Sequence, residues 1–377
     1  MSVNDAAFVM RGSQAPFAHP TPIGAAISKE TSRYAFRTDK DAANLLRIGV
    51  IGYGHWGPNV VRNLHGVDAY EVAAVCDKSP AALRRVNRLY PQVHLTTDAS
   101  ELLQSPHIDA IAVVTPAWTH FELAKAALLN GKHVFIEKPV TSTSQQAEEL
   151  IELAQRKNLK IMVDHTFLFG APVRKIRELV DDGTLGSLYY FDSTRVNLGL
   201  FQHDINVVWD LAPHDFSIMD HVIPDKPEAV VATGARHVNG VADVAFITVY
   251  FPGDVVAHLN VSWLSPVKMR TTLIGGKDKM LVWDDLEPEE KIRVYDKGVD
   301  ITESQGVYDA LVSYRSGDVW SPKLQQAEAL KLELEYFADC ILSDRTPSND
   351  GEAGLRVVRL LEAADQSLKN RGQIVCL

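Results

Sequence analysis

The sequence contains few cysteines, no long apolar stretch and no excess of basic residues. Its three cysteines, Cys76, Cys340 and Cys376, are odd in number and lack metal-ligand spacing, so we expect reduced thiols rather than a disulfide framework. The longest apolar runs, such as residues 108–114, are far shorter than the roughly 20 residues of a membrane-spanning helix. The N-terminus has no signal-peptide core. These absences predict a cytoplasmic protein without a membrane partner.

The charge balance argues against a nucleic-acid partner. Lysine and arginine number 38 against 48 acidic residues, which gives a net charge of −10, and the sequence has no basic stripe. A nucleic-acid surface would need such a stripe to neutralise phosphates. Metal binding has little support, because no cluster of histidine and acidic residues has convincing ligand spacing. A length of 377 residues suits two domains, so we expect a two-domain protein that binds a small molecule.

Residues 45–165 have the alternation of a doubly wound parallel sheet. Short apolar runs predict strands, and helical segments lie between them. The strands are expected at 47–51, 72–76, 108–114, 133–136 and 160–163, and the helices include 81–89, 119–130 and 144–157. This alternation is typical of an α/β Rossmann domain with helices on both faces of the sheet. Residues 1–44 are rich in Ala, Ser, Thr and Pro, so we expect an extension outside the folded core, either flexible or an oligomer arm.

Residues 166–377 predict an α+β domain with a large, mainly antiparallel sheet for substrate binding and oligomerisation. Glycine-containing turns such as 239–240 separate long strand-like runs. The expected strands are 187–197, 228–238, 242–251, 254–264, 270–275 and 279–283, and the helices are 172–182, 325–342 and 352–368. The polar residues 286–322 are expected to form a loop near the substrate or an interface. Because helices cover one face of such a sheet, we expect a homodimer or homotetramer through the other.

A glycine fingerprint follows the first predicted strand. Gly52, Gly54 and Gly57 form G-x-G-x-x-G, with His55 and Trp56 between them and a helix-compatible segment after them. In this context the glycines permit a tight turn, close approach of the backbone to a pyrophosphate, and packing of the helix on the strand. The helix start adds partial positive charge. The sequence therefore predicts a dinucleotide site.

The ends of the other predicted strands extend this site. The second strand ends at Asp77, where a carboxylate would accept hydrogen bonds from the adenosine ribose. A 2′-phosphate there would meet a repulsion of roughly 4 kcal/mol at 4 Å and a dielectric of 20. NAD is therefore favoured over NADP, although the charge of the neighbouring Lys78 would offset part of this repulsion. Later strands end at Thr115-Pro116 and Glu137-Lys138-Pro139. Since the carboxyl ends of parallel strands meet at one edge, we expect these residues around one crevice.

Asp210 and His214 form a second candidate constellation. Their i, i+4 spacing brings them to one face of a helix, with Pro213 near its first turn. The carboxylate would then fix the tautomer of the imidazole. A capping aspartate and a surface histidine explain the same spacing when it occurs alone.

Together these motifs resemble the Gfo/Idh/MocA family of sugar and inositol oxidoreductases. The resemblance covers residues 47–377. It is carried by the glycine loop, Thr115-Pro116-x-x-x-His120, Glu137-Lys138-Pro139, Asp210-x-x-x-His214 and tail residues such as Glu333 and Pro347. It implies that Lys138, Asp210 and His214 surround the nicotinamide and the substrate hydroxyl, and that the Lys138–Pro139 bond is cis. Residues 164–169 and 193–202 are most similar to members that resemble UDP-N-acetylglucosaminuronate 3-dehydrogenases, which implies a sugar-nucleotide substrate and a place in polysaccharide biosynthesis.

Further side chains are candidates for binding. Thr115, Pro116, His120 and Glu137 are expected near the nicotinamide half of the cofactor, although His120 equally suits a hydrogen-bonded histidine at a helix start. The candidate substrate contacts are His165, Arg195, Asn197 and Gln202. A structural role suits each of these four equally well. Arg195 has the geometry to bind a carboxylate or pyrophosphate.

The pKa values of free side chains separate the roles of Lys138 and His214. At pH 7 an unperturbed histidine, with a pKa of about 6.5, is mostly neutral, whereas a lysine near 10.4 is protonated. His214 is thus the better base, while Lys138 would stabilise the alkoxide, Asp210 would orient His214 and hydride would pass to the nicotinamide. Three alternatives remain open. These are an inositol or free-sugar dehydrogenase, an NAD-dependent glycoside hydrolase or lyase, and a non-catalytic NAD or sugar sensor.

Overall fold

The computed structural model describes residues 45–199, 205–302 and 311–377 of the chain. The predicted N-terminal extension (1–44) and the candidate Gln202 lie outside the described residues. Cys76, Cys340 and Cys376 are free thiols, as their spacing predicts. Within the described ranges, no helix is both long and apolar enough to cross a membrane.

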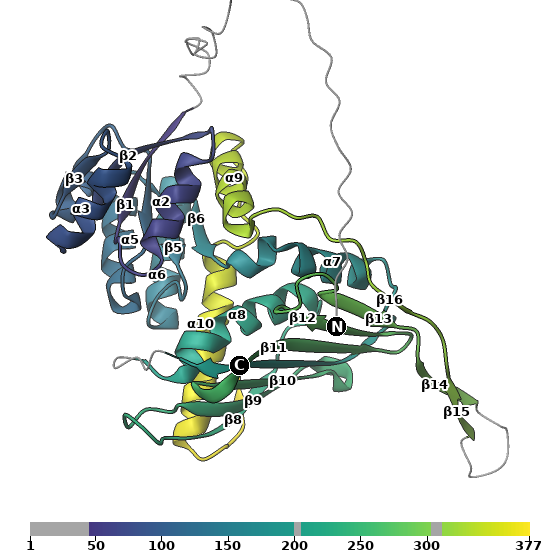
Figure 1. Cartoon of the computed structure of the whole chain (residues 1–377). Coiled ribbons are helices and arrows are strands. Elements are labelled where there is room, and N and C mark those ends of the chain that lie inside the picture. The colour runs from purple at the N-terminus through teal and green to yellow at the C-terminus, as the bar shows by residue number, and fades with distance from the viewer. Residues whose placement is uncertain (1–44, 200–204, 303–310) are drawn as a thin grey trace, which may run out of the picture. The chain divides into compact units, whose positions relative to one another are not determined.

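The first sheet has six parallel strands in the order β3-β2-β1-β4-β5-β6 (Figure 1). The strands are β1 (Leu46–Ile51), β2 (Tyr70–Cys76), β3 (His94–Thr96), β4 (Ala110–Val113), β5 (His133–Glu137) and β6 (Ile161–Asp164). This order is that of a dinucleotide-binding fold, so the predicted Rossmann architecture is confirmed. The sequence did not reveal β3, because only three residues pair and two of them are polar.

Helices cover both faces of this sheet because its strands are apolar on both sides. Along β4, Ala110 and Ala112 pack into one hydrophobic cluster, and Ile111 and Val113 pack into the other. The covering helices are α2 (Gly57–His65), α3 (Pro80–Leu89), α4 (Ala99–Gln104), α5 (His120–Leu129) and α6 (Ser144–Lys157). Side chains of Ser79, Asp98 and Thr143 cap α3, α4 and α6.

The second sheet has nine strands in the order β16-β13-β12-β11-β7-β10-β9-β8-β17, antiparallel except where β7 pairs with β10. Its strands are β7 (Leu188–Leu198), β8 (Ala229–Ala235), β9 (Val244–Tyr250), β10 (Val256–Ser262), β11 (Leu264–Gly276), β12 (Met280–Asp284), β13 (Ile292–Tyr295), β16 (Val319–Trp320) and β17 (Val375–Cys376). The prediction of a large, mainly antiparallel sheet is confirmed.

The predicted loop at 286–322 is wrong. Strands β13 and β16 extend the second sheet, and β14 (Gly298–Thr302) pairs with β15 (Leu311–Arg315) in a separate hairpin. Ile292 and Val294 are fully buried. The sequence did not predict β13 because these two alternating apolar residues lie in a mostly polar segment.

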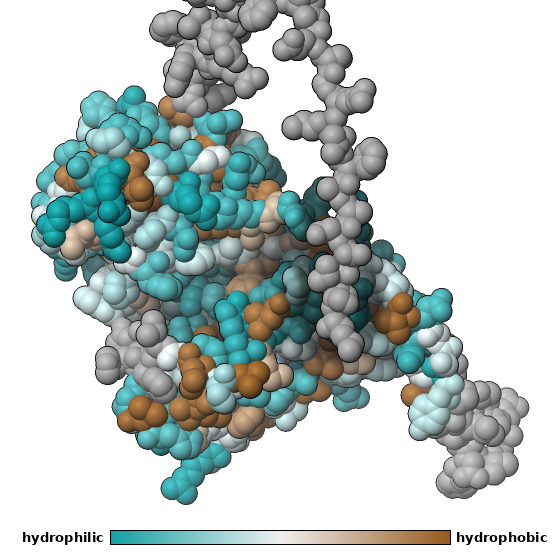
Figure 2. All heavy atoms as spheres, in the orientation of Figure 1, coloured by the Kyte–Doolittle hydropathy of each residue, from teal (hydrophilic) through white to brown (hydrophobic). Residues whose placement is uncertain are grey.

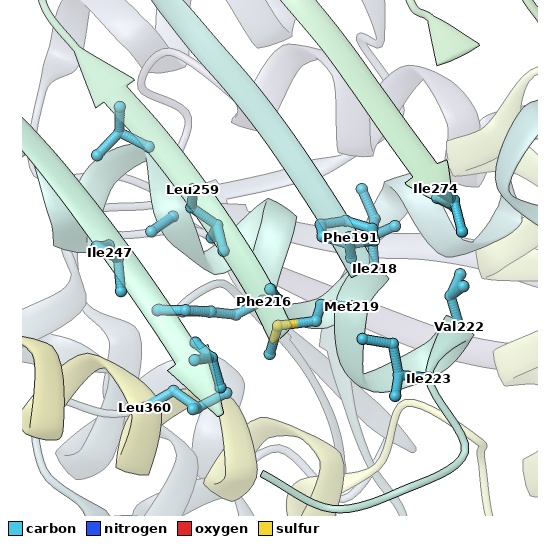
Figure 3. Packing of buried hydrophobic residues seen from close by; sticks show 14 of the residues in the cluster. Phe191, Phe216, Ile218, Met219, Val222, Ile223, Ile247, Leu259, Ile274 and Leu360 are labelled. Atoms are coloured by element: carbon cyan, nitrogen blue, oxygen red, sulfur yellow. The ribbon is translucent and has the colours of Figure 1, made fainter. Parts of the chain in front are cut away.

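Four helices follow the first domain, and three of them cover one face of the second sheet. They are α7 (Ala171–Asp181), α8 (Val207–Val222), α9 (Ala329–Leu342) and α10 (Gly351–Lys369). Phe216 and Met219 of α8 and Leu360 of α10 pack against Phe191 and Leu259 of the sheet (Figure 3). The helix α9 instead packs on the first sheet, where Leu334 and Phe337 are buried. The domain boundary expected at residue 165 therefore stays a prediction.

The other face of the second sheet carries exposed apolar side chains. Phe246 is 44% exposed and Tyr250 42% exposed, while alternating residues of β9 are buried. The ring of Phe246 stacks on His258 of the adjacent strand at 6.4 Å between centroids. Hydrophobic residues gather over the region of β8 to β10 (Figure 2). This face is available for a second protein surface.

Candidate active site

A cavity of about 530 Å³ lies where the strand ends of the first sheet face α8 and the second sheet. The predicted residues that line it are His55, Trp56, Glu137, Lys138, Asp210 and His214. Other lining residues include Asp164, Thr166, Phe167, Arg270, Trp283 and Asp285. The ammonium of one domain and the imidazole of the other thus share one cavity.

The glycine loop has two positions at which a side chain cannot fit. Gly52 has φ = +104°, and a Cβ atom there would lie 2.2 Å from the carbonyl oxygen of Val114. A Cβ atom at Gly57 would lie 2.6 Å from the oxygen of Gly52. At Gly54, by contrast, a Cβ atom would meet nothing within 4 Å. Gly52 and Gly57 therefore shape the turn, and Gly54 leaves open space above a backbone that can donate N–H groups.

Asp77 holds this loop at the end of β2. Its Oδ2 accepts from the backbone N–H of Tyr53 at 2.6 Å, and its Oδ1 accepts from the N–H of Ser79 at 2.7 Å. The carboxylate remains partly exposed at the edge where the glycine loop opens. With the open space at Gly54 and the start of α2 directly after the loop, these residues fit a dinucleotide.

His120 connects two loops instead of facing the cofactor. Its ring nitrogens lie 2.7 Å from the carbonyl oxygen of Thr115 and 2.8 Å from that of Pro139. The side chain is 1% exposed, and burial lowers its pKa. The predicted cofactor contact of His120 is therefore wrong, because both ring nitrogens are occupied by protein carbonyls. Thr115 and Pro116 lie in the same loop after β4, and their cofactor contacts stay a prediction.

Lys138 reaches across the cavity to α8. Its Nζ donates to the carbonyl oxygen of Asp210 at 2.8 Å and lies 3.9 Å from Asp210 Oδ1. The Lys138–Pro139 bond is cis, as the family resemblance implies. These contacts place the ammonium at the junction of the two domains.

The helix that carries His214 begins earlier than the sequence suggests. Asn206 caps α8 by accepting from the N–H groups of Val208 and Trp209. Pro213 consequently lies inside the helix and not in its first turn. Because proline has no N–H to donate, the carbonyl of Trp209, four residues earlier, lacks its helical donor. The carbonyl of Asp210, one residue further along, accepts from Lys138.

The predicted bond between Asp210 and His214 is also absent. Asp210 Oδ2 accepts from Trp263 Nε1 at 2.9 Å, whereas the buried Nδ1 of His214 has no hydrogen-bond partner among the described residues. The His214 ring instead meets Phe167 edge-on at 5.1 Å. Burial, together with the charges of Lys138 and Arg195, holds the pKa of His214 well below its usual value. The imidazole is therefore neutral at physiological pH.

Three carboxyl groups beside the cavity, one half-buried and two buried, were not foreseen as a unit. Glu137 and Asp164 end the adjacent strands β5 and β6, and Glu333 reaches them from α9. Burial, reinforced by the charge of Asp164, raises the pKa of Glu137 to about 8. Burial also raises the pKa of Asp164, and that of Glu333 well above its usual range. Asp164 accepts from Trp56 Nε1 at 2.8 Å. These shifts all favour the protonated carboxyl group over the carboxylate, and Asp164 anchors the glycine loop through Trp56.

Two predicted substrate contacts, Arg195 and His165, are not among the residues that line the main cavity, so their roles stay predictions. Arg195 is 5% exposed and forms a two-pronged ion pair with Asp215, at 2.7 and 3.0 Å. His165 is 2% exposed and lines a separate cavity of about 120 Å³, which Ser217 and His221 of α8 also line. Burial and the charge of Lys138 lower the pKa of His165 to about 4. Asn197 lies on β7 outside the residues that line the main cavity, so its role stays a prediction.

The parallel sheet, the glycine loop and the shared cavity define an oxidoreductase with an NAD-binding Rossmann fold. The family model described as "Oxidoreductase family, NAD-binding Rossmann fold" matches residues 46–165, and the "GFO/IDH/MocA C-terminal domain" matches residues 173–281. The chain therefore belongs to the Gfo/Idh/MocA family.

Two curated relatives match nearly their whole length. UDP-N-acetylglucosamine 3-dehydrogenase from Acidithiobacillus ferrooxidans is 29% identical over 83% of this chain and 94% of its own. Myo-inositol 2-dehydrogenase from Thermotoga maritima is 25% identical over 87% of this chain and 98% of its own. The solved structure of the first enzyme superposes with a TM-score of 0.75 at 26% identity, covering 87% of this chain and 99% of that one.

Proposed function

We propose that this oxidoreductase transfers hydride between NAD and a secondary hydroxyl of a sugar nucleotide. The observation that carries the proposal is the shared cavity, which both Lys138 and His214 line. The similarity to a UDP-N-acetylglucosamine 3-dehydrogenase supports the substrate class. Asp77 supports NAD over NADP, because its carboxylate would repel a 2′-phosphate.

The residues of the cavity divide the chemistry between a base and an electrostatic partner. His214 is held neutral by burial and neighbouring cations, so one ring nitrogen has a lone pair that accepts the hydroxyl proton. The ammonium of Lys138 stabilises the oxygen that becomes negative. Bound NAD supplies the hydride acceptor. The rings of Phe167 and Trp283 and the surrounding walls limit water beside the reacting carbon.

Asp210 has a different role from the one expected for it. Its carbonyl oxygen and carboxylate both lie near Lys138 Nζ, and Trp263 holds the carboxylate in place. We infer that Asp210 is a positioning residue for Lys138 and not for His214.

An inositol dehydrogenase is a second candidate, favoured by the similarity to myo-inositol 2-dehydrogenase. Both candidates oxidise a ring CH–OH group. A glycoside hydrolase or lyase would share the first step but show no net NADH. A sensor has less support, because the chain keeps both Lys138 and His214.

The deciding experiment follows NADH absorbance while the enzyme is given NAD with UDP-sugars, free sugars and inositols. We expect NADH to form with at least one UDP-sugar. If only inositols react, the second candidate is correct. Release of a leaving group without NADH would show glycoside cleavage, and NAD binding without turnover on any substrate would show a sensor.

We also propose that the exposed face of the second sheet joins two copies of the chain. Phe246 and Tyr250 provide the apolar centre that such an interface needs. Light scattering of the wild type and of Phe246→Asp tests this. A dimer or tetramer that dissociates in the variant supports the proposal, and a monomeric wild type refutes it.

A further inference from the structure

Two arginines lie side by side on adjacent strands of the second sheet. Arg195 of β7 and Arg270 of β11 are direct cross-strand partners, so their side chains leave the sheet on the same face. Both guanidinium groups lie against the ring of Phe167, at 4.7 Å for Arg195 and 5.9 Å for Arg270. The similarity ends there, because only Arg270 lines the main cavity.

The charges of the two arginines are neutralised to different degrees. Arg195 is buried in its two-pronged pair with Asp215. Arg270 has a single looser contact, with Asp285 Oδ2 at 3.4 Å. Asp285 is shared with Lys291, whose Nζ lies 3.8 Å away. Two cations therefore share the carboxylate of Asp285, so the charge of Arg270 is less fully neutralised than that of Arg195.

A second donor lies on the same wall. Trp283 is 2% exposed and lines the cavity, and its indole N–H is buried without a hydrogen-bond partner among the described residues. The ring packs edge-on against Phe167 at 6.4 Å. A buried donor without a partner costs free energy, so an acceptor supplied by a ligand would satisfy it.

We propose that Arg270 and Trp283 form a subsite for an acidic group of the substrate, a carboxylate or a phosphate. The inference rests on the proposed function and deepens it, because it restricts the substrates to sugars with such a group. An arginine fork and an indole N–H donate, and oxygens of a carboxylate or phosphate accept. The reacting hydroxyl would lie toward Lys138 and His214, and the acidic group toward the second sheet.

The test compares ligands that differ by the acidic group alone. Equilibrium binding to the NADH-loaded enzyme is measured by calorimetry for glucuronate against glucose, and for N-acetylglucosamine 1-phosphate against N-acetylglucosamine. The first pair detects a carboxylate and the second a phosphate. We expect the acidic member of at least one pair to bind about 10-fold to 100-fold more tightly, the range of one charge-assisted hydrogen bond.

Variants then locate the effect. Arg270→Gln should remove this preference, and Arg270→Lys should keep part of it, because a lysine keeps the charge without the fork. Trp283→Phe should weaken acidic ligands by about 3-fold to 10-fold. Asp285→Asn should tighten them, since the competing carboxylate is gone. Arg293→Gln is the matched control, because Arg293 pairs through Val282 and Leu273 onto the opposite face of the sheet.

The outcomes separate this inference from the proposed function. A wild type that binds both members of each pair equally, or an Arg270→Gln variant that keeps the preference, overturns the subsite even if sugars are oxidised. An acidic preference that disappears only in Arg270→Gln supports the subsite even if none of these sugars reduces NAD.

Discussion

The two sheets contribute to the cavity in different ways. The parallel sheet presents residues at or just after the last positions of its strands, such as Glu137, which ends β5, and Lys138, which follows it. The second sheet presents residues from within its strands, such as Arg270 on β11 and Trp283 on β12. The positions of the first set depend on where each strand ends. The positions of the second set depend on the face of the sheet from which each side chain projects. A local motif can therefore identify the first set, whereas the second depends on strand register.

The largest expected effect tests the strand-end residues. Lys138→Met removes the ammonium and should lower kcat about 10³-fold, the upper range for losing one electrostatic donor. NAD affinity should change little, because the glycine loop is untouched. Steady-state turnover and cofactor titration measure both quantities. Full activity in this variant would remove Lys138 from the mechanism.

The next effect concerns Arg195, the arginine of the second sheet that does not line the main cavity. Asp215→Asn leaves the buried Arg195 without its counter-charge and should destabilise the fold by about 3–5 kcal/mol. Asp285→Asn, beside the more exposed Arg270, should cost less than about 1 kcal/mol. Denaturant unfolding gives both values. Equal losses in the two variants would contradict the difference between the arginines.

A smaller difference is expected between substitutions at Gly52 and Gly54, which lie in one loop. Gly52→Ala should destabilise the fold by about 3 kcal/mol, because a positive φ and a backbone clash act together. Gly54→Ala should leave the unfolding free energy within about 1 kcal/mol and weaken NAD binding instead. Thermal unfolding and cofactor titration distinguish the two losses. A Gly54→Ala protein with wild-type NAD affinity would mean that the cofactor does not approach this glycine.

The smallest effect concerns the buried acids at the ends of β5 and β6. Glu137 has a folded pKa of about 8 against 4.5 for the ordinary side chain. Between these values the folded chain keeps a proton that the unfolded chain releases, so stability falls as the pH rises. The slope is at most about 1.4 kcal/mol per pH unit for one proton.

Thermal unfolding from pH 5 to 8 measures this slope. Glu137→Gln should flatten it relative to the wild type, whereas the exposed Glu122→Gln should not. Identical slopes in all three proteins would show that Glu137 is ionised in the folded state.

The sequence predicted the parts of the site that depend on neighbouring residues. The glycine turn, Asp77 and the Lys138–Pro139 segment follow from local pattern or family motif. Arg195 was a candidate because it lies in the segment 193–202 that resembles the family, whereas Arg270 was not proposed. The two arginines are direct cross-strand partners on one face of the sheet, and only the set of side chains that line the cavity shows that Arg270 borders it. Asp210 and His214 were correctly put on one helix, but the partner of Asp210 is Trp263, which lies 53 positions later.

The helix α10 belongs to both hydrophobic cores. Leu355 and Val358 pack with the parallel sheet, whereas Leu360 and Leu361 pack with the second sheet. Arg356 of the same helix pairs with Asp220 of α8 at 2.8 Å. A hinge motion that separated the two halves would have to pull one of these pairs of side chains out of its core. We therefore expect substrate to enter by local movement at the rim of the cavity and not by hinge opening of the two halves.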